Sequence, residues 1–347
     1  MINNNKIRIG IVGIGRMGIT HHSILNCNNK VTVTAVADPS VFVTSLMKRY
    51  LNVLTFKNYD DLINSVPLDA LIVATPPHLH YDILKKAVSK NLHVFVEKPY
   101  TISYEQSLEL SNLFQSKNLI NQVGYVNRFN DIFKELKSLI NDKLIGDVLQ
   151  FKSEMFSNTI SQKDNNSSGW RASSNSGGGA VYELASHAID LVNFIIGKPD
   201  KVVGSTINSI YSKNVEDSVC STFLYNNGCF GTININWCEY SYRKPANKFE
   251  IFGSKGKILA DQHGLKIFLN EIIPNKNFKK GWNIRYITDV FTNASVDIRG
   301  TEYTHQLNHF VDCIDDKSIK NKSTFSDGKD THEIIKNIFI NNEQNKL

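Results

Sequence analysis

The stretch IRIGIVGIGRMG, residues 7 to 18, decides the fold class of this chain. Its first half is an apolar run of strand length, and its second half places glycines at positions 13, 15 and 18. Glycine permits a tight turn and a close approach of the backbone to a bound group, and a helix that follows such a turn offers free N–H groups to phosphate. We therefore predict a strand, a turn and a helix that together bind a dinucleotide.

An acidic residue ends the next apolar stretch and supports this interpretation. Asp38 lies 20 residues after Gly18, where a carboxylate can bind the ribose hydroxyls of a dinucleotide. The same carboxylate repels a 2′-phosphate, and Pro39-Ser40 supplies no arginine to hold one. We expect NAD rather than NADP. The alternative is a glycine turn in a doubly wound fold that binds no nucleotide.

The first 124 residues continue the alternation of strand and helix patterns. Apolar strands are predicted at Ile7–Val12, Val31–Ala37, Val53–Phe56, Leu68–Ala74, Leu92–Val96 and Leu119–Val123. Amphipathic stretches of helical length, such as Tyr81–Lys90 and Tyr104–Lys117, lie between them. Such alternation predicts a parallel sheet covered on both faces, which is a doubly wound Rossmann domain over residues 1–124.

After Asn130 the pattern becomes that of an α+β domain. A helix at Asp131–Asn141 precedes alternating stretches at Val148–Phe156, Val202–Ile210, Ser218–Tyr225, Cys229–Trp237, Phe249–Phe252, Lys257–Ala260 and Leu265–Leu269. Further helices are expected at Ala180–Ile196, Tyr303–Asp315 and Asp330–Asn341. Strands of this pattern predict a large, mostly antiparallel sheet with one exposed face. We assign residues 125–347 to this domain; the family resemblance described below implies that it serves substrate binding and oligomerisation.

Composition narrows the class of protein further. The net charge of +6 is spread along the chain, so it does not favour a nucleic-acid partner. Five cysteines, without a C-x-x-C pair, indicate reduced thiols in a cytoplasmic protein. The start of the chain fits a first strand better than a signal peptide, and no apolar stretch approaches the ~20 residues of a membrane span. We expect a protein with no membrane partner.

Charged residues stand where the fifth predicted strand ends. Leu92–Val96 runs into Glu97-Lys98-Pro99, and proline cannot donate to a sheet ladder, so pairing must stop there. The carboxyl ends of such strands form the edge where open α/β sheets bind ligands. This position favours a binding role for the charged pair over an incidental ion pair on a solvated strand end.

Histidines at two places raise the question of a metal. His78 and His80 follow the fourth strand with no acidic or cysteine partner at ligand spacing, and we expect their loop to pack over the cofactor. His305 and His309 are four residues apart on a predicted helix, where a helix surface or a subunit contact is the better interpretation. We predict no metal site.

Seven motifs in order resemble the Gfo/Idh/MocA family of glucose–fructose oxidoreductase, inositol dehydrogenase and rhizopine catabolism proteins. They are "GIGRMG", "VADPS", "LIVATPPHLH", "VFVEKPYT", "GYVNRFN", "GWRASSNSGGGAVYELASHAIDLV" and "FEIFGSKGKI", and the resemblance covers about residues 6 to 340. It implies that Lys98 reaches the nicotinamide and the reacting hydroxyl, with Glu97 as its electrostatic partner and a lysine–proline bond that is often cis. It also implies that His187 transfers the proton.

The motifs and the resemblance together give a set of site residues. Catalysis is assigned to Lys98, His187 and Glu183. Cofactor binding is assigned to Gly13, Gly15, Arg16, Met17, Gly18, Asp38, Thr75, Pro76, His80, Glu97 and Lys98. Substrate binding is assigned to Asn127, Arg128, Trp170, Arg171 and His187.

The helix that carries His187 holds three of its polar residues on one predicted face. Glu183, His187 and Asp190 are spaced i, i+4 and i+7, and Gly177-Gly178-Gly179 before them lets the chain pass close to a ligand. We expect Asp190 to fix the helix. Glu183 departs from the family, which commonly has an aspartate there, so its carboxylate reaches one methylene further.

The resemblance implies reversible oxidation of a ring hydroxyl on a carbohydrate. The insert "GWNIRYITDVFTNASVDIRGTEY" resembles that of members acting on nucleotide sugars for surface polysaccharides, and inositol or a free sugar is the alternative substrate. Two other classes stay open: a glycoside hydrolase that retains NAD, and a sensor that only binds the cofactor. The family also implies a homodimer or homotetramer through the sheet of the second domain.

Overall fold

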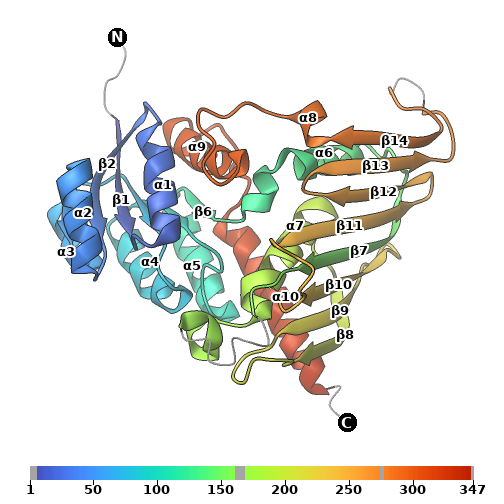
Figure 1. Cartoon of the computed structure of the whole chain (residues 1–347), viewed down its shortest axis with the longest axis horizontal. Helices are drawn as coiled ribbons and strands as arrows, with labels where there is room; N and C mark the ends of the chain where they lie inside the picture. The colour runs from blue at the N-terminus through green and yellow to red at the C-terminus, as the bar shows by residue number, and fades with distance from the viewer. Residues whose placement is uncertain (1–5, 161–168, 274–276, 345–347) are drawn as a thin grey trace. The chain divides into compact units, whose positions relative to one another are not determined.

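The computed structural model describes residues 6–160, 169–273 and 277–344, which fall into two compact units (Figure 1). The first unit comprises the chain up to Val126 together with Asn293–Lys329. The second comprises Asn127–Thr292 and the chain from Asp330 onward. The predicted domains differ in one respect, because residues 293–329 had been assigned to the second domain. Leu307 and Phe310 in this segment pack in a core of the first unit instead.

A six-stranded parallel sheet forms the centre of the first unit, as predicted. Its order is β3-β2-β1-β4-β5-β6. The strands are β1 (Ile7–Val12), β2 (Val31–Ala37), β3 (Leu54–Phe56), β4 (Ala70–Val73), β5 (His93–Val96) and β6 (Asn121–Val123). Because β1 and β4 are neighbours while β2 and β3 lie on the other side of β1, the sheet reverses its winding between β1 and β4, where doubly wound folds bind ligands.

Helices cover both faces of this sheet. One core joins α1 (Arg16–Asn26), α2 (Val41–Leu51) and α9 (Thr301–Asp315) to one face, and the other joins α3 (Tyr59–Ser65), α4 (His80–Ser89) and α5 (Tyr104–Ser116) to the opposite face. Alternation along β1 explains this, since Ile9 and Ile11 belong to the first core and Val12 to the second. The predicted doubly wound architecture is confirmed.

The second unit is built on an eight-stranded sheet in the order β14-β13-β12-β11-β7-β10-β9-β8 (Figure 1). The strands are β7 (Val148–Phe156), β8 (Lys201–Asn208), β9 (Ser218–Leu224), β10 (Phe230–Asn236), β11 (Ala246–Gly253), β12 (Gly256–Asp261), β13 (Gly264–Leu269) and β14 (Gly281–Tyr286). Only the β7–β10 pair is parallel among the pairs of this sheet that the structure describes. The predicted mostly antiparallel sheet is therefore confirmed.

Helices cover one face of the second sheet. The core contains residues of α6 (Asp131–Asn141), α7 (Ser186–Ile195) and the second-unit part of α10 (Phe325–Gln344), packed on the inward side chains of β7 and β9–β13. A short helix, α8 (Ile287–Val290), follows β14. None of the helices in the described ranges combines the length and apolar character that crossing a bilayer requires.

Two segments of the second unit differ from the sequence prediction. Gly281–Tyr286, taken as the start of a long insert, forms the edge strand β14, and the alternation of Trp282, Ile284 and Tyr286 is the pattern that a strand would show. The predicted helix Ala180–Ile196 begins as one π-helical segment, Val181–Ala185, before α7. Such segments often occur at functional sites.

Candidate active site

The glycine turn after β1 leaves the start of α1 open to a ligand. Side chains of Ser40, Asn58 and Ser103 cap α2, α3 and α5, but the N-cap of α1 is Gly15, which has no side chain to cap it. A Cβ atom added to Gly15 would meet nothing within 4 Å. The N–H groups at this end of α1 and the open space beside Gly15 therefore fit a pyrophosphate.

The other two glycines of the turn are required by the packing of the protein itself. Gly13 has a φ of +88°, and a Cβ there would lie 2.8 Å from the backbone of Ala74. A Cβ on Gly18 would lie 1.9 Å from the carbonyl oxygen of Gly13. Of the remaining turn residues, Arg16 is exposed and Met17 is half-buried at the start of the helix. Gly13 and Gly18 thus serve the packing of the protein, whereas Gly15 leaves space for a ligand.

Asp38 braces the turn from the end of β2. One carboxylate oxygen accepts a hydrogen bond from the N–H of Ile14 at 2.8 Å, and the other accepts one from the N–H of Ser40 at 2.9 Å. Each carboxylate oxygen has a further lone pair, so the half-buried side chain can still accept hydrogen bonds from two ribose hydroxyls. The position suits the predicted contact with NAD.

The loop after β4 is tied to the Lys98 segment by His80. Its ring nitrogens lie 2.8 Å from the carbonyl oxygen of Thr75 and 3.1 Å from that of Pro99, and the side chain is fully buried. Burial lowers the pKa of His80 to about 4. Thr75 and Pro76 are half-buried. In the structure His80 holds two loops together, and its predicted contact with the cofactor stays a prediction.

The charged pair at the end of β5 is held firmly in the first unit. The Nε2 atom of His21 lies 2.7 Å from Oε1 of Glu97, and the following Lys98–Pro99 peptide is cis. Lys98 itself is half-buried. The predicted electrostatic pairing of Lys98 with Glu97 stays a prediction, and the structure adds His21 as a hydrogen-bond partner of the Glu97 carboxylate. Sequence reasoning missed His21, because only the fold brings α1 to the end of β5.

In the second unit, Trp170 and Arg171 lie in a short 3₁₀ segment, Trp170–Ala172. The Nε and Nη2 atoms of Arg171 lie 3.2 and 3.1 Å from Oε1 of Glu183. The guanidinium carbon lies 4.5 Å from the centre of the Trp170 ring. The side chain of Arg171 is 44% exposed and that of Glu183 is 13% exposed. The longer carboxylate of Glu183 therefore reaches a cation that solvent also reaches.

His187 is half-buried in the first turn of α7, directly after the π-helical segment. The segment is anchored by Glu216, whose Oε1 accepts a hydrogen bond from the N–H of Val181 at 2.9 Å. Burial raises the pKa of Glu216. No local pattern pointed to Glu216, which lies more than thirty residues away in the sequence.

The glycines before this segment serve close contacts within the protein. A Cβ on Gly178 would lie 2.2 Å from the carbonyl oxygen of Arg171, and a Cβ on Gly179 would lie 2.2 Å from Oε1 of Glu216. Gly179 also has a φ of +103°. The sequence predicted that these glycines let the chain approach a ligand. In the structure, they let the chain approach its own neighbouring segments.

Arg128 and Asp190 form a buried ion pair in the second unit. The Nη2 atom of Arg128 lies 2.7 Å from Oδ1 of Asp190, and its Nε lies 2.9 Å from Oδ2. The side chains are only 5% and 1% exposed. Asp190 thus fixes α7, as expected. Arg128 also holds this helix through the pair; its predicted contact with a substrate stays a prediction, as does that of its half-buried neighbour Asn127.

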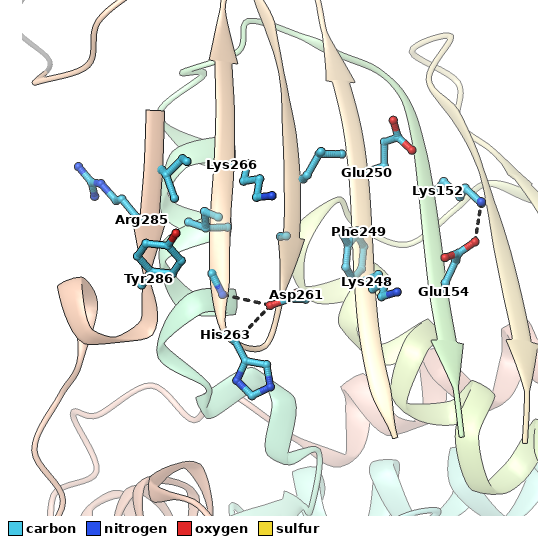
Figure 2. Close-up of a pocket in the computed structure, with 15 residues that line it drawn as sticks. Lys152, Glu154, Lys248, Phe249, Glu250, Asp261, His263, Lys266, Arg285 and Tyr286 are labelled. Carbon is cyan, nitrogen blue, oxygen red and sulfur yellow. Dashed lines mark hydrogen bonds and ion pairs between the residues drawn. The ribbon is translucent and has the colours of Figure 1, made fainter. Parts of the chain in front are cut away.

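A separate hollow lies on the open face of the second sheet (Figure 2). Its volume is about 360 Å³, and its lining comes from β7 and β11–β14, including Lys152, Glu154, Lys248 and Asp261. No residue predicted for the active site lines it. Among the described residues, no group of three or more His, Cys, Asp or Glu side chains is arranged to hold a metal ion.

Comparison with known sequences gives two family models and several relatives. Residues 7–125 match the model described as an oxidoreductase family with an NAD-binding Rossmann fold, and residues 133–259 match the GFO/IDH/MocA C-terminal domain. Two uncharacterised oxidoreductases of Schizosaccharomyces pombe are each 30% identical over 200 residues, which is 56% of this chain. The chain spans about half the length of these first relatives, namely 54% and 53%.

Two further relatives match over longer stretches. The myo-inositol 2-dehydrogenase of Thermotoga maritima is 25% identical over 92% of this chain and 87% of its own length. The 2,7-anhydro-N-acetylneuraminate hydratase of Escherichia coli is 27% identical over 74% of this chain and 68% of its own length. Dehydrogenases and a hydratase therefore both lie among the relatives of this chain.

Solved structures share the whole fold. A levoglucosan dehydrogenase in complex with NADH is 18% identical, has a TM-score of 0.86 and matches over 98% of both chains. The WlbA dehydrogenase of Bordetella pertussis, in complex with NADH and UDP-GlcNAcA, is 18% identical with a TM-score of 0.86, over 99% of this chain and 97% of that one. At these identities the likeness shows the fold. The matches to both family models show that the chain belongs to the GFO/IDH/MocA oxidoreductase family, with an NAD-binding Rossmann domain.

Proposed function

We propose that this protein interconverts a ring hydroxyl and a ketone on a carbohydrate, with NAD as the redox partner. The observation that carries the proposal is the position of Lys98. It follows β5 at the same edge of the parallel sheet at which β1 ends in the glycine turn. A cationic side chain at the sheet edge that carries the dinucleotide-binding turn would lie beside a cofactor bound there, which supports the assignment of Lys98 to catalysis.

The residues around the glycine turn fit NAD. The N–H groups at the start of α1 and the open space beside Gly15 would receive the pyrophosphate, and Asp38 would accept hydrogen bonds from the adenosine ribose. Arg16, Met17, Thr75 and Pro76 complete the proposed contacts. When bound, NAD supplies a hydride acceptor and donor at C4 of its nicotinamide.

The protein supplies proton transfer. Removing a hydride from a carbinol carbon requires that the hydroxyl lose its proton, and a histidine side chain can accept and return a proton near neutral pH. We assign this step to His187. The ammonium group of Lys98 would stabilise the negative charge that develops on the oxygen. We also assign Glu183 to catalysis, because it lies in the π-helical segment directly before α7, the helix that carries His187.

The substrate class is a sugar or a nucleotide sugar. Trp170 and Arg171 present an aromatic face and a guanidinium that is 44% exposed, which suit a sugar ring and an anionic group. The structural neighbours include one that binds levoglucosan and one that binds UDP-GlcNAcA. We favour a nucleotide sugar, with Asn127 as a further contact. Inositol or a free sugar is the competing choice.

The test is NADH absorbance with purified protein and NAD against UDP-sugars, free sugars and inositols, each with the wild type and Lys98→Ala. We expect one compound to give NADH, and we expect the variant to lose about 10²- to 10⁴-fold in turnover because an acid–base or charge-stabilising group is missing. Binding of NAD, followed by its effect on thermal unfolding, should change far less. Equal turnover in the variant would refute the role of Lys98.

A second candidate is a lyase or hydratase that keeps its NAD. The 27% identity to a hydratase favours this alternative. Transient oxidation next to the bond that breaks, followed by reduction, would give a product without net NADH. Product analysis by mass spectrometry in the same panel separates the two: a new sugar product with flat absorbance supports the lyase, and stoichiometric NADH supports the dehydrogenase.

We also propose that the open face of the second sheet joins two copies of the chain. The strand register places five apolar residues in one row across that face, together with Gln150 and Lys257: Leu224, Phe230, Phe252, Phe268 and Trp282. Phe230, Phe252 and Trp282 are 43%, 40% and 48% exposed, and large apolar patches are rare on monomers. Light scattering should show an oligomer that Phe252→Glu weakens, whereas Phe42→Glu, at an exposed residue of the first unit, should not.

A further inference from the structure

Lys98 belongs to a segment whose neighbours on both sides are fixed by buried histidines. His80 faces the carbonyl of Pro99, which follows Lys98, and His21 binds the side chain of Glu97, which precedes it. The sequence motif of the glycine turn ends at Gly18 and does not include His21. The role of His21 is therefore a separate question from cofactor binding.

The hydrogen bond between His21 and Glu97 has good geometry for a strong contact. The Nε2 to Oε1 distance is 2.7 Å, and a carboxylate can only accept, so Nε2 donates. The side chain of His21 is fully buried and that of Glu97 is 14% exposed. Charge-assisted hydrogen bonds away from water are among the stronger polar contacts in proteins.

His21 makes this one hydrogen bond at a cost. Its other ring nitrogen, Nδ1, is buried and has no hydrogen-bond partner among the described residues. A buried polar atom without a partner is unfavourable, so an apolar side chain would fit the site better if His21 served only to fill it. Its ring packs edge-on against the ring of Phe95, with the two ring centres 5.2 Å apart. An apolar residue could also make this contact.

The carboxylate of Glu97 also packs closely against Gly124. A Cβ on Gly124 would lie 3.2 Å from Oε2 and 3.3 Å from the carboxyl carbon of Glu97. The N–H of Glu97 donates to the carbonyl of Val73, and the N–H of Gly124 donates to the carbonyl of Val96. Glu97 is thus fixed in backbone and side chain, one residue before Lys98.

We propose that His21 is a positioning residue: by holding Glu97, it fixes the place of Lys98 at the sheet edge. This inference rests on the proposed function for its catalytic consequence. A displacement of about 1 Å in a reacting group can cost about 10²-fold in rate, so the effect falls on turnover. His21 lies in α1, so the helix that would bind the pyrophosphate also holds the segment that carries Lys98.

The test compares His21→Leu, His21→Gln and the matched control His22→Leu. Glutamine can place an N–H near the position of the imidazole Nε2, whereas leucine keeps only the apolar contact with Phe95. His22 is the next residue of α1 and is only 5% exposed, but it projects about 100° away around the helix. The control therefore reproduces the loss of a buried histidine without the contact to Glu97.

Two readouts decide the outcome. In steady-state kinetics, His21→Leu should lower kcat about 10- to 100-fold with the affinity for NAD changed less than about threefold, and His21→Gln should recover most of kcat. In hydrogen exchange followed by mass spectrometry, the peptide that spans residues 93–101 should lose protection in His21→Leu alone. A merely structural role would not give rescue by glutamine together with a loss confined to this peptide.

Three results would overturn the inference: an unchanged kcat in His21→Leu, an equal loss in His21→Gln, or an equal loss in His22→Leu. If no compound in the panel is turned over by the wild type, the proposed function fails on that measurement. The exchange measurement still decides whether His21 fixes the Glu97–Lys98 segment, and unchanged protection there would refute it.

Discussion

The two segments that carry the proposed site are built in opposite ways. In the first unit, His21 is hydrogen-bonded to the side chain of Glu97, and His80 contacts the carbonyl of Pro99 on the other side of Lys98. Both histidines are fully buried. In the second unit, Arg171 lies in a 3₁₀ turn, where solvent reaches nearly half of its side chain. One segment is fixed by contacts that are costly to change, and the other by contacts worth little.

This difference separates the chemistry from the choice of substrate. A buried hydrogen bond to a charged group contributes about 1.5–3 kcal/mol, whereas an exposed ion pair contributes about 0–1 kcal/mol. The side chain of Arg171 can therefore change with little loss of folding free energy. We infer that the Lys98 segment maintains the reaction and that the Arg171 segment is the part able to adapt to a substrate.

The largest expected effect tests the buried ion pair between Arg128 and Asp190 in the second unit. Replacing Arg128 with leucine leaves the carboxylate of Asp190 buried without its cation, which should cost about 3–5 kcal/mol in the free energy of unfolding. Urea denaturation followed by circular dichroism measures this change. The double variant Arg128→Leu/Asp190→Leu removes both charges and should recover much of the loss. A single variant as stable as the wild type would contradict the role of the pair.

Acid should weaken the first unit before the second. The pKa of His80 is lowered to about 4 by burial, which outweighs the opposing effects of the carbonyls of Thr75 and Pro99 and of the charge of Glu97. An unfolded histidine titrates near 6.5, so between about pH 6.5 and 4 the unfolded chain binds more protons. The stability that His80 contributes is therefore complete above about pH 6.5 and is lost towards pH 4, by about 3 kcal/mol. His309, also in the first unit, has a pKa lowered to about 4 by burial.

The stability that Asp217 contributes to the second unit should be lost only at lower pH. Burial alone would raise the pKa of Asp217, but hydrogen bonds from the N–H of Ser212 and the indole of Trp237 lower it overall. Its contribution is kept above the ordinary carboxyl pKa and is lost below it. Hydrogen exchange at pH 7, 5 and 4, with rates corrected for pH, should show protection falling in the first unit first. Equal loss in both units at pH 5 would contradict this order.

Two glycines of one turn should separate folding from binding. Alanine at position 18 would clash with the carbonyl of Gly13 and should cost about 1–3 kcal/mol in the free energy of unfolding. Alanine at position 15 meets nothing within 4 Å, so stability should stay within about 0.5 kcal/mol. Its methyl group would instead occupy the space proposed for the pyrophosphate. Thermal unfolding with and without NAD distinguishes the two, and normal NAD affinity in Gly15→Ala would count against that site.

The sequence predicts the first unit better than the second because its signals are local. The spacing of Gly13, Gly15 and Gly18, and an acidic residue at the end of the next strand, follow from adjacent backbone geometry. The apolar runs of a sheet buried on both faces are similarly plain. Both architectures, the cofactor and the family were confirmed.

What the sequence could not predict depends on contacts between distant residues. His21 reaches Glu97 across 76 positions, and Glu216 reaches Val181 across 35. The π-helical segment also escaped detection, since its apolar pattern resembles that of an ordinary helix. The partner of Arg128 escaped detection for a related reason: the motif around this arginine gives no sign of Asp190, which lies 62 positions away in the sequence. The assigned site residues remain predictions.

Arg171→Gln should have the smallest effect on stability and the clearest effect on substrate binding. Replacing Arg171 with glutamine breaks an ion pair whose arginine is 44% exposed, so the free energy of unfolding should change by less than about 1 kcal/mol. If the guanidinium recognises an anionic group of the substrate, KM should rise about tenfold or more for a nucleotide sugar, because a charge-assisted contact of about 1.5–3 kcal/mol is lost. The kcat should stay near that of the wild type, since Lys98 lies in the other unit.

The partner of Arg171 offers the matched control. Glu183→Gln removes the carboxylate but keeps the length of the side chain, which frees the guanidinium for an anionic ligand. We expect it to lower KM for a nucleotide sugar if Glu183 only competes for Arg171, and to lower kcat if Glu183 takes part in catalysis. An unchanged KM in Arg171→Gln, with kcat reduced instead, would reverse the comparison: the exposed segment would then serve the reaction, and specificity would have to lie elsewhere.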